Sequence, residues 1–540
     1  MRGTRLFALV VLLALLAAVA LVFLSPRAPV TAKRSLKTPP KIAYADHTEA
    51  FKKAGITEYQ GAASCVDCHE EATKAAFHSY HYQMANVVDD VVGKGPVKMG
   101  GKYAYNDFCG AILWQGEKNV NYIGKAVLKA PPPEYEDKKG TLIATGCSMC
   151  HGVSLGLIPQ EEMTEAQVKN LDCLACHADP AVYPAGSKAI KTGAKEVYQD
   201  ENGTWHYRVK VPIEKLAAAI TKSPPKDQCL LCHAYSGGGP GFKRPNLEPA
   251  LLGEVPEAVD VHLARGMECT DCHVFEEHQV ALKGPDTWAR SEKAKAPECA
   301  DCHEKRHTRP LLGWVLRTFH EEKVACQTCH IPHYAKKAPT DTHRDWSQAE
   351  FSPEMNRWEP LLDLKKNQVP TYRYWNEKTR VAYLYPEPAT PEEGKITYLA
   401  PESQGAKRNG LFFKADGKIY PFKYHEAKVP YSGEAKIPVP VKVGLVFATG
   451  DTAKAAQVGA KIAGIPFEGE YVTLVRYMSV NHGVEPAENA LKCLACHGPT
   501  LRRMPWHELG YGNYPEIAFT LALLIGLLVL IALVYLLFKK

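Results

Sequence analysis

The feature that most constrains this chain is a five-residue signature, Cys-x-x-Cys-His, that occurs eight times and uses sixteen of the seventeen cysteines. Two thiols three residues apart share one face of a helical turn, where both can form thioethers with the vinyl groups of one haem. The histidine that follows is placed to bind the iron. The spacing therefore predicts eight covalently bound haem c groups and electron-transfer chemistry.

We number the motifs 1 to 8 in chain order. Paired cysteines also form zinc sites, redox dithiols or disulfides, but these alternatives do not explain why histidine follows every second cysteine. The predicted attachment cysteines and proximal histidines are Cys65, Cys68 and His69; Cys147, Cys150 and His151; Cys173, Cys176 and His177; Cys229, Cys232 and His233; Cys269, Cys272 and His273; Cys299, Cys302 and His303; Cys326, Cys329 and His330; and Cys493, Cys496 and His497.

The second axial position of each iron distinguishes an electron relay from a catalyst. A transfer haem is closed by a second histidine or methionine, whereas a catalytic haem leaves one side open to substrate. Of the 21 histidines, 13 lie outside the motifs, which is enough for seven or eight bis-histidine haems. Each could also be an ordinary surface or core histidine. The predicted distal ligands are His47, His81, His262, His278, His307, His320, His425 and His482.

Both ends of the chain are apolar. Residues 1–24, with Arg2 and Arg5 near their start, predict a signal peptide or an uncleaved anchor. Residues 517–538 carry no charge over 22 residues and predict a transmembrane helix. Because positive residues lie outside both segments, we expect a protein anchored in the cytoplasmic membrane, with its haem domain on the periplasmic or extracytoplasmic face.

Motif spacing suggests the organisation of the body. Residues 25–45 form a Pro- and Lys-rich tether, and residues 46–515 form one octahaem domain. Motifs 2 to 7 follow one another closely, so the helices that carry them must pack against porphyrin in place of a side-chain core. The predicted fold is mainly α with extensive loops, without a large sheet.

An insertion over residues 343–480 separates motifs 7 and 8. Asp416-Gly417 lies between two apolar and aromatic runs and predicts a β-hairpin, so the few strands of the chain are expected here. Residues 474–478 and 485–492 are predicted to be helical.

The formal net charge is +6, but the propionates of eight haems would offset it. The lysine-rich stretches are expected to face solvent or propionates, and nucleic-acid binding is not predicted.

Several strings that flank the motifs resemble the octahaem tetrathionate reductases, relatives of octahaem hydroxylamine oxidoreductase and of multihaem nitrite reductases. They span most of residues 45–515 and are ADHTEAFK before motif 1, NDFC at 106–109, NLDCLACH at 170–177, VACQTCHIP at 324–332, KIYPFKYH at 418–425 and ENALKCLACHG with ELGY over 488–511. The resemblance implies a catalytic haem on motif 2, with the one unpaired cysteine, Cys109, beside it.

The resemblance also implies that a lysine after motif 3 binds the catalytic iron, for which Lys188 is the candidate, with Lys191 behind it. Asn106 and Asp107 would orient substrate or move protons. The implied reaction converts tetrathionate and two electrons to two thiosulfates, at a site that takes a small anionic substrate. Electrons would come from a quinol-oxidising membrane protein or a cytochrome.

Other functions stay open. A related nitrite reductase would carry one Cys-x-x-Cys-Lys motif, whereas all eight motifs here end in histidine. A hydroxylamine oxidoreductase would need a tyrosine crosslinked to its catalytic haem, which Tyr511 or Tyr514 could supply, although tyrosine is also common at membrane boundaries. The third alternative is a non-catalytic electron conduit with every iron closed by two ligands.

Overall fold

The computed structural model describes most of the chain from residue 42 onward. The described residues are 42–88, 96–111, 125–127, 142–144, 149–202, 205–251, 253, 255–282, 296–304, 306–308, 310–381, 387–401, 403, 405–410, 412–497 and 503–538. The predicted N-terminal segment 1–24 and most of the tether lie outside these residues, as does Cys147 of motif 2.

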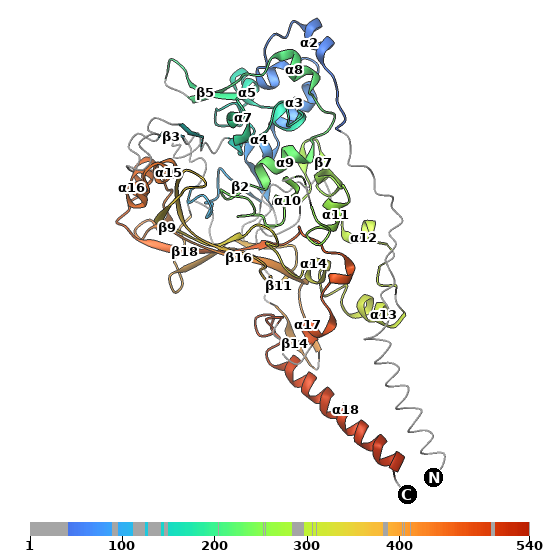
Figure 1. Ribbon diagram of the computed structural model, residues 1–540. Coiled ribbons are helices and arrows are strands. Elements are labelled where there is room, and N and C mark those ends of the chain that lie inside the picture. The colour runs from blue at the N-terminus through green and yellow to red at the C-terminus, as the bar shows by residue number, and fades with distance from the viewer. Residues whose placement is uncertain are drawn as a thin grey trace.

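Short helices gather at one end of the molecule, a sheet crosses the middle, and one long helix projects from the other end (Figure 1). The helices of the first half are α2 (Thr48–Ala54), α3 (Glu70–Phe77), α4 (Tyr80–Gln83), α5 (Glu165–Asn170), α6 (Leu174–His177), α7 (Ser187–Lys191), α8 (Ile213–Ala218) and α9 (Lys226–His233). Further along are α10 (Glu248–Leu251), α11 (Val261–Ala264), α12 (Cys299–Cys302), α13 (Pro310–Phe319) and α14 (Cys326–His330), and the 3-10 turns include η1 (Gly61–Ser64) and η4 (Cys269–Asp271).

Small hairpins lie among these helices. They pair β1 (Ala85–Val88) with β2 (Val97–Gly100), β3 (Lys125–Val127) with β4 (Leu142–Ala144), β5 (Lys195–Gln199) with β6 (Trp205–Val209), and β7 (Phe275–Glu276) with β8 (Gln279–Val280).

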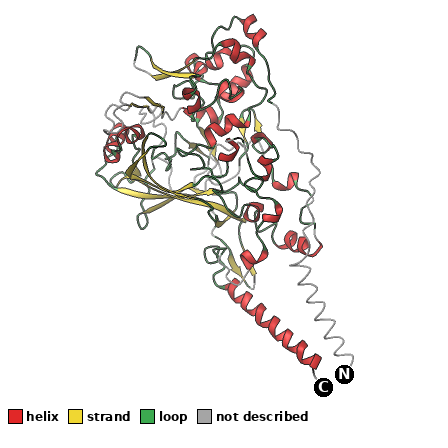
Figure 2. Ribbon diagram, in the orientation of Figure 1, coloured by secondary structure: helices red, strands yellow, loops and turns green. Residues whose placement is uncertain are grey.

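A mixed eight-stranded sheet occupies residues 340–479 (Figure 2). Its strand order is β10-β9-β16-β18-β13-β12, and β11 and β17 also pair with β16. The pairs β16 with β9 and β13 with β18 run parallel. The strands are β9 (Thr340–Ser352), β10 (Arg357–Lys365), β11 (Thr371–Trp375), β12 (Thr379–Val381), β13 (Lys395–Pro401), β16 (Lys418–Ser432), β17 (Ile437–Pro438) and β18 (Tyr471–Ser479).

The prediction of a mainly α fold without a large sheet was wrong. Strand β16 is buried along nearly its whole length, so its sequence lacks the alternation of apolar and polar residues that marks a strand with one exposed face. Residues 474–478, predicted to be helical, belong to β18, which is also largely buried. Within residues 485–492, the helical part is the 3-10 turn η5 (Ala487–Asn489).

The predicted hairpin at Asp416-Gly417 was also wrong. This turn joins β15 (Phe412–Lys414) to β16, but β15 pairs with β14 (Lys407–Asn409), whereas β16 pairs with strands of the large sheet. The position of the turn was predicted correctly, but the partners of the two strands lie elsewhere in the sequence.

An apolar core joins the sheet to the two helices beside it, α15 (Val443–Thr449) and α16 (Thr452–Ala463). Its buried members include Trp346 of β9, Leu474 of β18 and Val446 of α15. This is an ordinary side-chain core. The described apolar clusters of the motif-bearing half are mostly smaller, as expected where porphyrin supplies the packing surface.

The last elements are α17 (Cys493–His497), which carries motif 8, and α18 (Tyr514–Phe538). Helix α18 is long and apolar enough to cross a membrane by length and composition, and most of its apolar side chains are exposed. It projects away from the body of the molecule (Figure 1).

Gly417 gives a test of this fold. Its φ is +91°, and a Cβ atom built on it would lie 2.2 Å from the carbonyl oxygen of Trp375 in β11. We expect Gly417→Ala to lower the free energy of unfolding by about 2 kcal/mol or more, because it adds a backbone clash to the cost of a left-handed alanine.

The matched control is Gly410→Ala, at a glycine with φ +64° and no atom within 4 Å of the added Cβ. Its cost should be about 1 kcal/mol. Denaturant unfolding followed by circular dichroism measures both values, and equal losses in the two variants would contradict the close approach to β11.

Candidate functional site

Six motif histidines each face one of the predicted distal histidines. The distances between ring centroids are 6.1 Å for His69 and His47, 6.3 Å for His233 and His81, 6.3 Å for His177 and His278, 6.0 Å for His303 and His262, 6.1 Å for His273 and His482, and 6.0 Å for His497 and His320. Imidazole nitrogens bind metal ions at about 2 Å, so two rings on opposite sides of one iron have centroids about 6 Å apart. The six pairs therefore fit bis-histidine haem ligation.

Most of these pairs connect segments that are far apart in the sequence. His482, which precedes motif 8, faces His273 of motif 5, and His81, which follows motif 1, faces His233 of motif 4. An iron between such rings would therefore crosslink the chain as well as carry an electron.

Motif 7 has a further candidate pair. Burial lowers the pKa of His330, and the charge of His307 adds to the shift, so these two histidines lie near each other. His307 Nδ1 is 2.9 Å from Glu321 Oε1, which leaves Nε2 for a metal ion.

His425 lies elsewhere, which corrects its predicted role as a distal ligand. It is fully buried in β16, where both ring nitrogens face carboxylates. Nδ1 is hydrogen-bonded to Asp107 Oδ2 at 2.6 Å, and Nε2 lies 3.7 Å from Asp341 Oδ1. From the sequence, His425 is recognisable only as a histidine outside the motifs. The two acids that surround it come from distant segments and could not be predicted.

Cysteines of different motifs lie side by side. Side-chain hydrogen bonds join Cys65 to Cys173, Cys150 to Cys232, Cys229 to Cys269 and Cys299 to Cys326. Cys272 of motif 5 and Cys302 of motif 6 are close enough to interact electrostatically. The amide of Leu491 donates to Cys329 O at 2.9 Å and brings motif 8 to motif 7. The attachment points thus form a continuous path from motif 8 through motifs 7, 6, 5 and 4 to motif 2.

Motif 2 is distinguished by its surroundings. Burial lowers the pKa of His151 to about 4, and the charge of Lys243 adds to the shift. Helix α7 begins against Cys150, whose thiol accepts a hydrogen bond from the Ser187 amide. The next residue, Lys188, is exposed on α7, as is Lys191. Lys188 is therefore adjacent to the attachment point of motif 2, and its binding to the iron stays a prediction.

Cys109 lies on a tight turn over residues 106–111, which we call the Cys109 turn. Asn106 and Ala111 form a β-bridge. Gly110 packs so closely that a Cβ there would lie 2.7 Å from the Trp346 ring. Trp346 Nε1 also donates to the carbonyl oxygen of Asp107 at 3.0 Å. The large sheet, through β9, therefore holds the turn in place.

Four cationic side chains surround the ring of Phe108, which precedes Cys109. The distances from the ring centroid are 5.2 Å to Lys423 Nζ, 5.5 Å to Arg344 Cζ, 5.6 Å to Lys243 Nζ and 5.7 Å to Arg476 Cζ. The ring of His425 stacks on Phe108 at 3.9 Å with an interplanar angle of 15°. An aromatic ring stabilises cations that are removed from water.

Two buried carboxylates balance part of this charge. Asp107 Oδ1 accepts a hydrogen bond from Arg476 Nη1 at 2.5 Å, and Asp341 Oδ2 accepts one from Arg344 Nε at 2.8 Å. The four cations exceed the two carboxylates by two charges when both lysines are protonated and His425 is neutral. We call the whole group the cationic cluster; its members are Asp107, Cys109, Lys243, Asp341, Arg344, Lys423, His425 and Arg476.

Comparisons with known proteins agree with the motif geometry. Residues 341–500 match the family model described as cytochrome c bacterial, and residues 255–331 match that described as cytochrome c7 and related cytochrome c. An uncharacterized protein of Archaeoglobus fulgidus is 47% identical over 248 residues, which are 45% of this chain and 83% of that protein. This chain belongs to the multihaem c-type cytochromes. It binds haem c covalently.

Among solved structures, the fold of this cytochrome is similar to that of the octaheme cytochrome c from Shewanella oneidensis. The TM-score is 0.62, and the likeness covers 87% of this chain and 97% of that one at 23% sequence identity. The similarity concerns the fold.

Burial sets the protonation of the cationic cluster in this cytochrome. It raises the pKa of the Cys109 thiol, although Lys243 and Arg344 act in the opposite direction. It lowers the pKa of Lys243 to about 7, with Arg476 and Arg244 adding to the shift. It also lowers the pKa of Lys423 to about 7. Both lysines therefore change charge near neutral pH.

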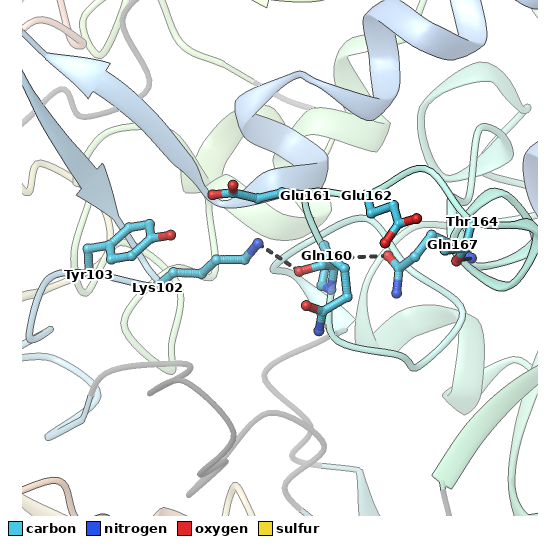
Figure 3. A pocket seen from close by; sticks show the side chains of 8 residues that line it. Lys102, Tyr103, Gln160, Glu161, Glu162, Thr164 and Gln167 are labelled. Carbon is cyan, nitrogen blue, oxygen red and sulfur yellow. Dashed lines mark hydrogen bonds between the residues drawn. The ribbon is translucent and has the colours of Figure 1, made fainter.

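A separate surface hollow holds none of the predicted site residues (Figure 3). Lys102 donates there to the carbonyl oxygen of Pro159 at 2.7 Å, and the Gln160 amide donates to Gln167 Oε1 at 2.9 Å. Glu161 on its wall pairs with Lys98. Polar groups that line the hollow thus already have hydrogen-bond partners within the protein.

Sequence reasoning named Asn106, Asp107 and Cys109 but missed the charged side chains that surround them. The missed residues are Lys243, Asp341, Arg344, Lys423 and Arg476. Two of them carried a usable signal, because Lys423 and Arg476 are cations inside largely apolar strands, where each is 1% exposed. Cations at such positions are rarely buried without a specific partner.

The histidine pairs give a direct test. We expect His278→Ala to convert one low-spin iron to a high-spin iron that binds added ligands, because His278 is the ring that faces His177. Electron paramagnetic resonance of the ferric holoprotein measures the change.

Two controls accompany this variant. His206→Ala removes a histidine bonded to Asp200, and His425→Ala removes the buried histidine of the cationic cluster. Neither should create a high-spin iron. A new high-spin signal in His425→Ala would show that His425 is a distal ligand after all.

Proposed function

We propose that this cytochrome carries eight haems, is anchored in a membrane by α18, and reduces a small dianionic oxidant at motif 2, beside Cys109. Tetrathionate is the substrate that fits best. The other seven haems would deliver electrons along the path of adjacent motifs, and a haem at motif 2 would supply them to the substrate. Lys188 is the proposed sixth ligand of that iron.

The observation that carries this proposal is the position of Lys243. Its charge acts on the thiol of Cys109 and on the ring of His151. The cationic cluster and motif 2 are therefore neighbours, although Cys109, His151 and Lys243 come from three separate segments. This proximity supports the proposal that a substrate of a motif 2 haem binds at the cluster.

The charge of the cluster suits a dianion. Tetrathionate carries two negative charges, and its cleavage by two electrons gives two thiosulfates with four, without any proton being consumed. Positive charge that is already in place stabilises such a build-up of negative charge. Fixed cations such as Arg344 and Arg476 therefore matter more to this reaction than an acid would.

The remaining residues position these charges. Asp107 accepts hydrogen bonds from both Arg476 and His425, and so joins the Cys109 turn to β18 and β16. Arg344 donates to the carbonyl oxygens of Phe108 and Gly237. The cations thus point at one turn from three strands of the sheet, and they need not rearrange when an anion binds.

One observation favours a second substrate class. His425 connects Asp107 to the neighbourhood of Asp341, and a buried histidine between two acids can pass protons. Nitrite reduction consumes protons, whereas tetrathionate reduction does not. Nitrite and hydroxylamine are therefore the substrates to compare with tetrathionate, and a relay without a reactive iron is the non-enzymatic alternative.

Re-oxidation of the chemically reduced holoprotein tests the proposal. We expect tetrathionate to re-oxidise the haems faster than nitrite or hydroxylamine, and Cys109→Ala to slow the tetrathionate reaction by about 100-fold, as is common when a group that contacts the reacting atoms is removed. Stopped-flow absorbance of the haems measures these rates.

Haem content and histidine ligation of Cys109→Ala serve as the control, since Cys109 is outside every motif. Unchanged re-oxidation in this variant would remove Cys109 from the site. Equal re-oxidation rates with and without tetrathionate would exclude tetrathionate reduction. If no haem reacted with any of the three substrates, the protein would be a non-catalytic electron conduit.

The two lysines predict a pH dependence. Both are charged below pH 7 and lose their protons as the pH rises through about 7, which removes the excess positive charge of the cluster. We expect the KM for tetrathionate to rise by about tenfold between about pH 6 and about pH 8.5, because charge complementarity to the dianion is lost. Steady-state kinetics with a water-soluble electron donor measures it.

Lys243→Gln should raise the KM at low pH and flatten the profile, since one titrating charge is gone. Lys98→Gln, at a lysine paired with Glu161 beside the hollow of Figure 3, is the matched control and should leave the profile unchanged. A KM that falls as the pH rises would contradict the assignment of the cluster as an anion site.

A further inference from the structure

We propose that motif 8 holds the haem through which this cytochrome takes electrons from the membrane, and that the electron source is a lipid-soluble hydroquinone. The inference rests on the membrane anchoring and the haem relay proposed above. It assigns a direction to the relay and a chemical class to the donor.

Motif 8 lies at the base of the apolar helix. A chain of aromatic rings leads from the motif 8 histidine to the first residue of α18. The centroid distances are 6.2 Å from His497 to Trp506, 5.5 Å from Trp506 to Tyr511, 4.8 Å from Tyr511 to Phe413, and 5.1 Å from Phe413 to Tyr514. Figure 1 shows α17 beside the near end of α18. A haem at motif 8 would therefore lie close to the membrane surface.

The base of α18 is fixed to the body. Cys496 packs against a core cluster that includes Leu509 and Tyr374. Tyr374 and Tyr511 share a hydrogen bond of 2.6 Å between their hydroxyl groups. Arg503 donates to the Tyr372 hydroxyl at 3.0 Å. The distance between motif 8 and the helix is thus set by packed side chains.

Motif 8 is also one end of the path of adjacent motifs. Its contact with motif 7 is the hydrogen bond from Leu491 to Cys329, and from there the path continues through Cys326 and Cys299 toward motif 2. A branch leaves this path at motif 4, where Cys232 interacts electrostatically with Cys176 of motif 3, and it ends at motif 1, where Cys65 contacts Cys173 of motif 3. Motifs 8 and 1 therefore lie at different ends of the relay, and motif 8 is the one beside α18.

The donor must be soluble in the membrane and must release single electrons. A hydroquinone does this when it is oxidised to a quinone: two electrons leave one at a time and reduce two ferric haems, and two protons pass to water at the membrane surface. The aromatic residues Trp506, Tyr511 and Tyr514 are of the kind that lies at the boundary between lipid and water. No other oxidant or reductant is required.

The test uses full-length holoprotein in phosphatidylcholine vesicles that contain tetramethylhydroquinone. His320 faces His497, so His320→Met changes a ligand of motif 8 only. His47→Met is the matched control, because His47 faces His69 of motif 1 at the other end of the relay. A methionine ligand keeps the iron low-spin and raises its reduction potential. An electron that enters at this haem would therefore pass to the next haem more slowly.

We expect His320→Met to slow the reduction of the remaining haems by the vesicle hydroquinone by about tenfold, and His47→Met to leave it unchanged. Stopped-flow absorbance follows the haems. Reduction by dithionite from water should proceed alike in both variants. Electron paramagnetic resonance shows that each variant retains its full set of low-spin irons. His320→Ala provides a second variant if methionine does not bind.

An equal effect of both variants, or no effect of His320→Met, would overturn the assignment of motif 8 as the entry point. Vesicle hydroquinone that fails to reduce the wild-type protein would overturn the donor. Vesicle flotation reports the anchoring separately, and turnover of tetrathionate with a water-soluble donor reports the proposed reaction separately.

Discussion

The structure depends on one constraint, the spacing of paired imidazoles at the distance that two ligands on opposite faces of one iron would have. Six histidine pairs have this spacing, and most of them join parts of the chain that are remote in sequence. In the motif-bearing half, helices are short and described apolar clusters are mostly small, so metal–ligand bonds and porphyrin surface would take over what side-chain packing does elsewhere. Electron transfer and folding then rely on the same contacts.

The large sheet has a different role. It has an ordinary apolar core, and it presents Arg344, Lys423, His425 and Arg476 from three strands to the Cys109 turn. A turn of six residues cannot hold two acids and four cations in place by itself. The sheet supplies that rigidity, which loops and helices packed on cofactors would not.

Part of this could be predicted from the sequence. The motifs fix cysteine and histidine ligands by local spacing, and counting the remaining histidines identified the six that face a motif. Their pairing could not be predicted, because it depends on how distant segments meet, as with His482 and His273. His425 was misassigned for the same reason, since a buried histidine beside Asp107 and one beside iron look alike in sequence. The sheet was missed because its central strand β16 is buried along nearly its whole length and gives no clear alternation of apolar and polar residues. Lys243 had no local signal among 65 basic residues.

The ion pair between Asp107 and Arg476 spans most of the described chain, and this has a consequence for biosynthesis. A ribosome makes seven of the eight motifs before it reaches residue 476. A nascent chain therefore contains most of its haem-attachment motifs while the cationic cluster is still incomplete. Only a nearly finished polypeptide brings the guanidinium of Arg476 to the carboxylate of Asp107, so this cluster is among the last parts of the molecule to form.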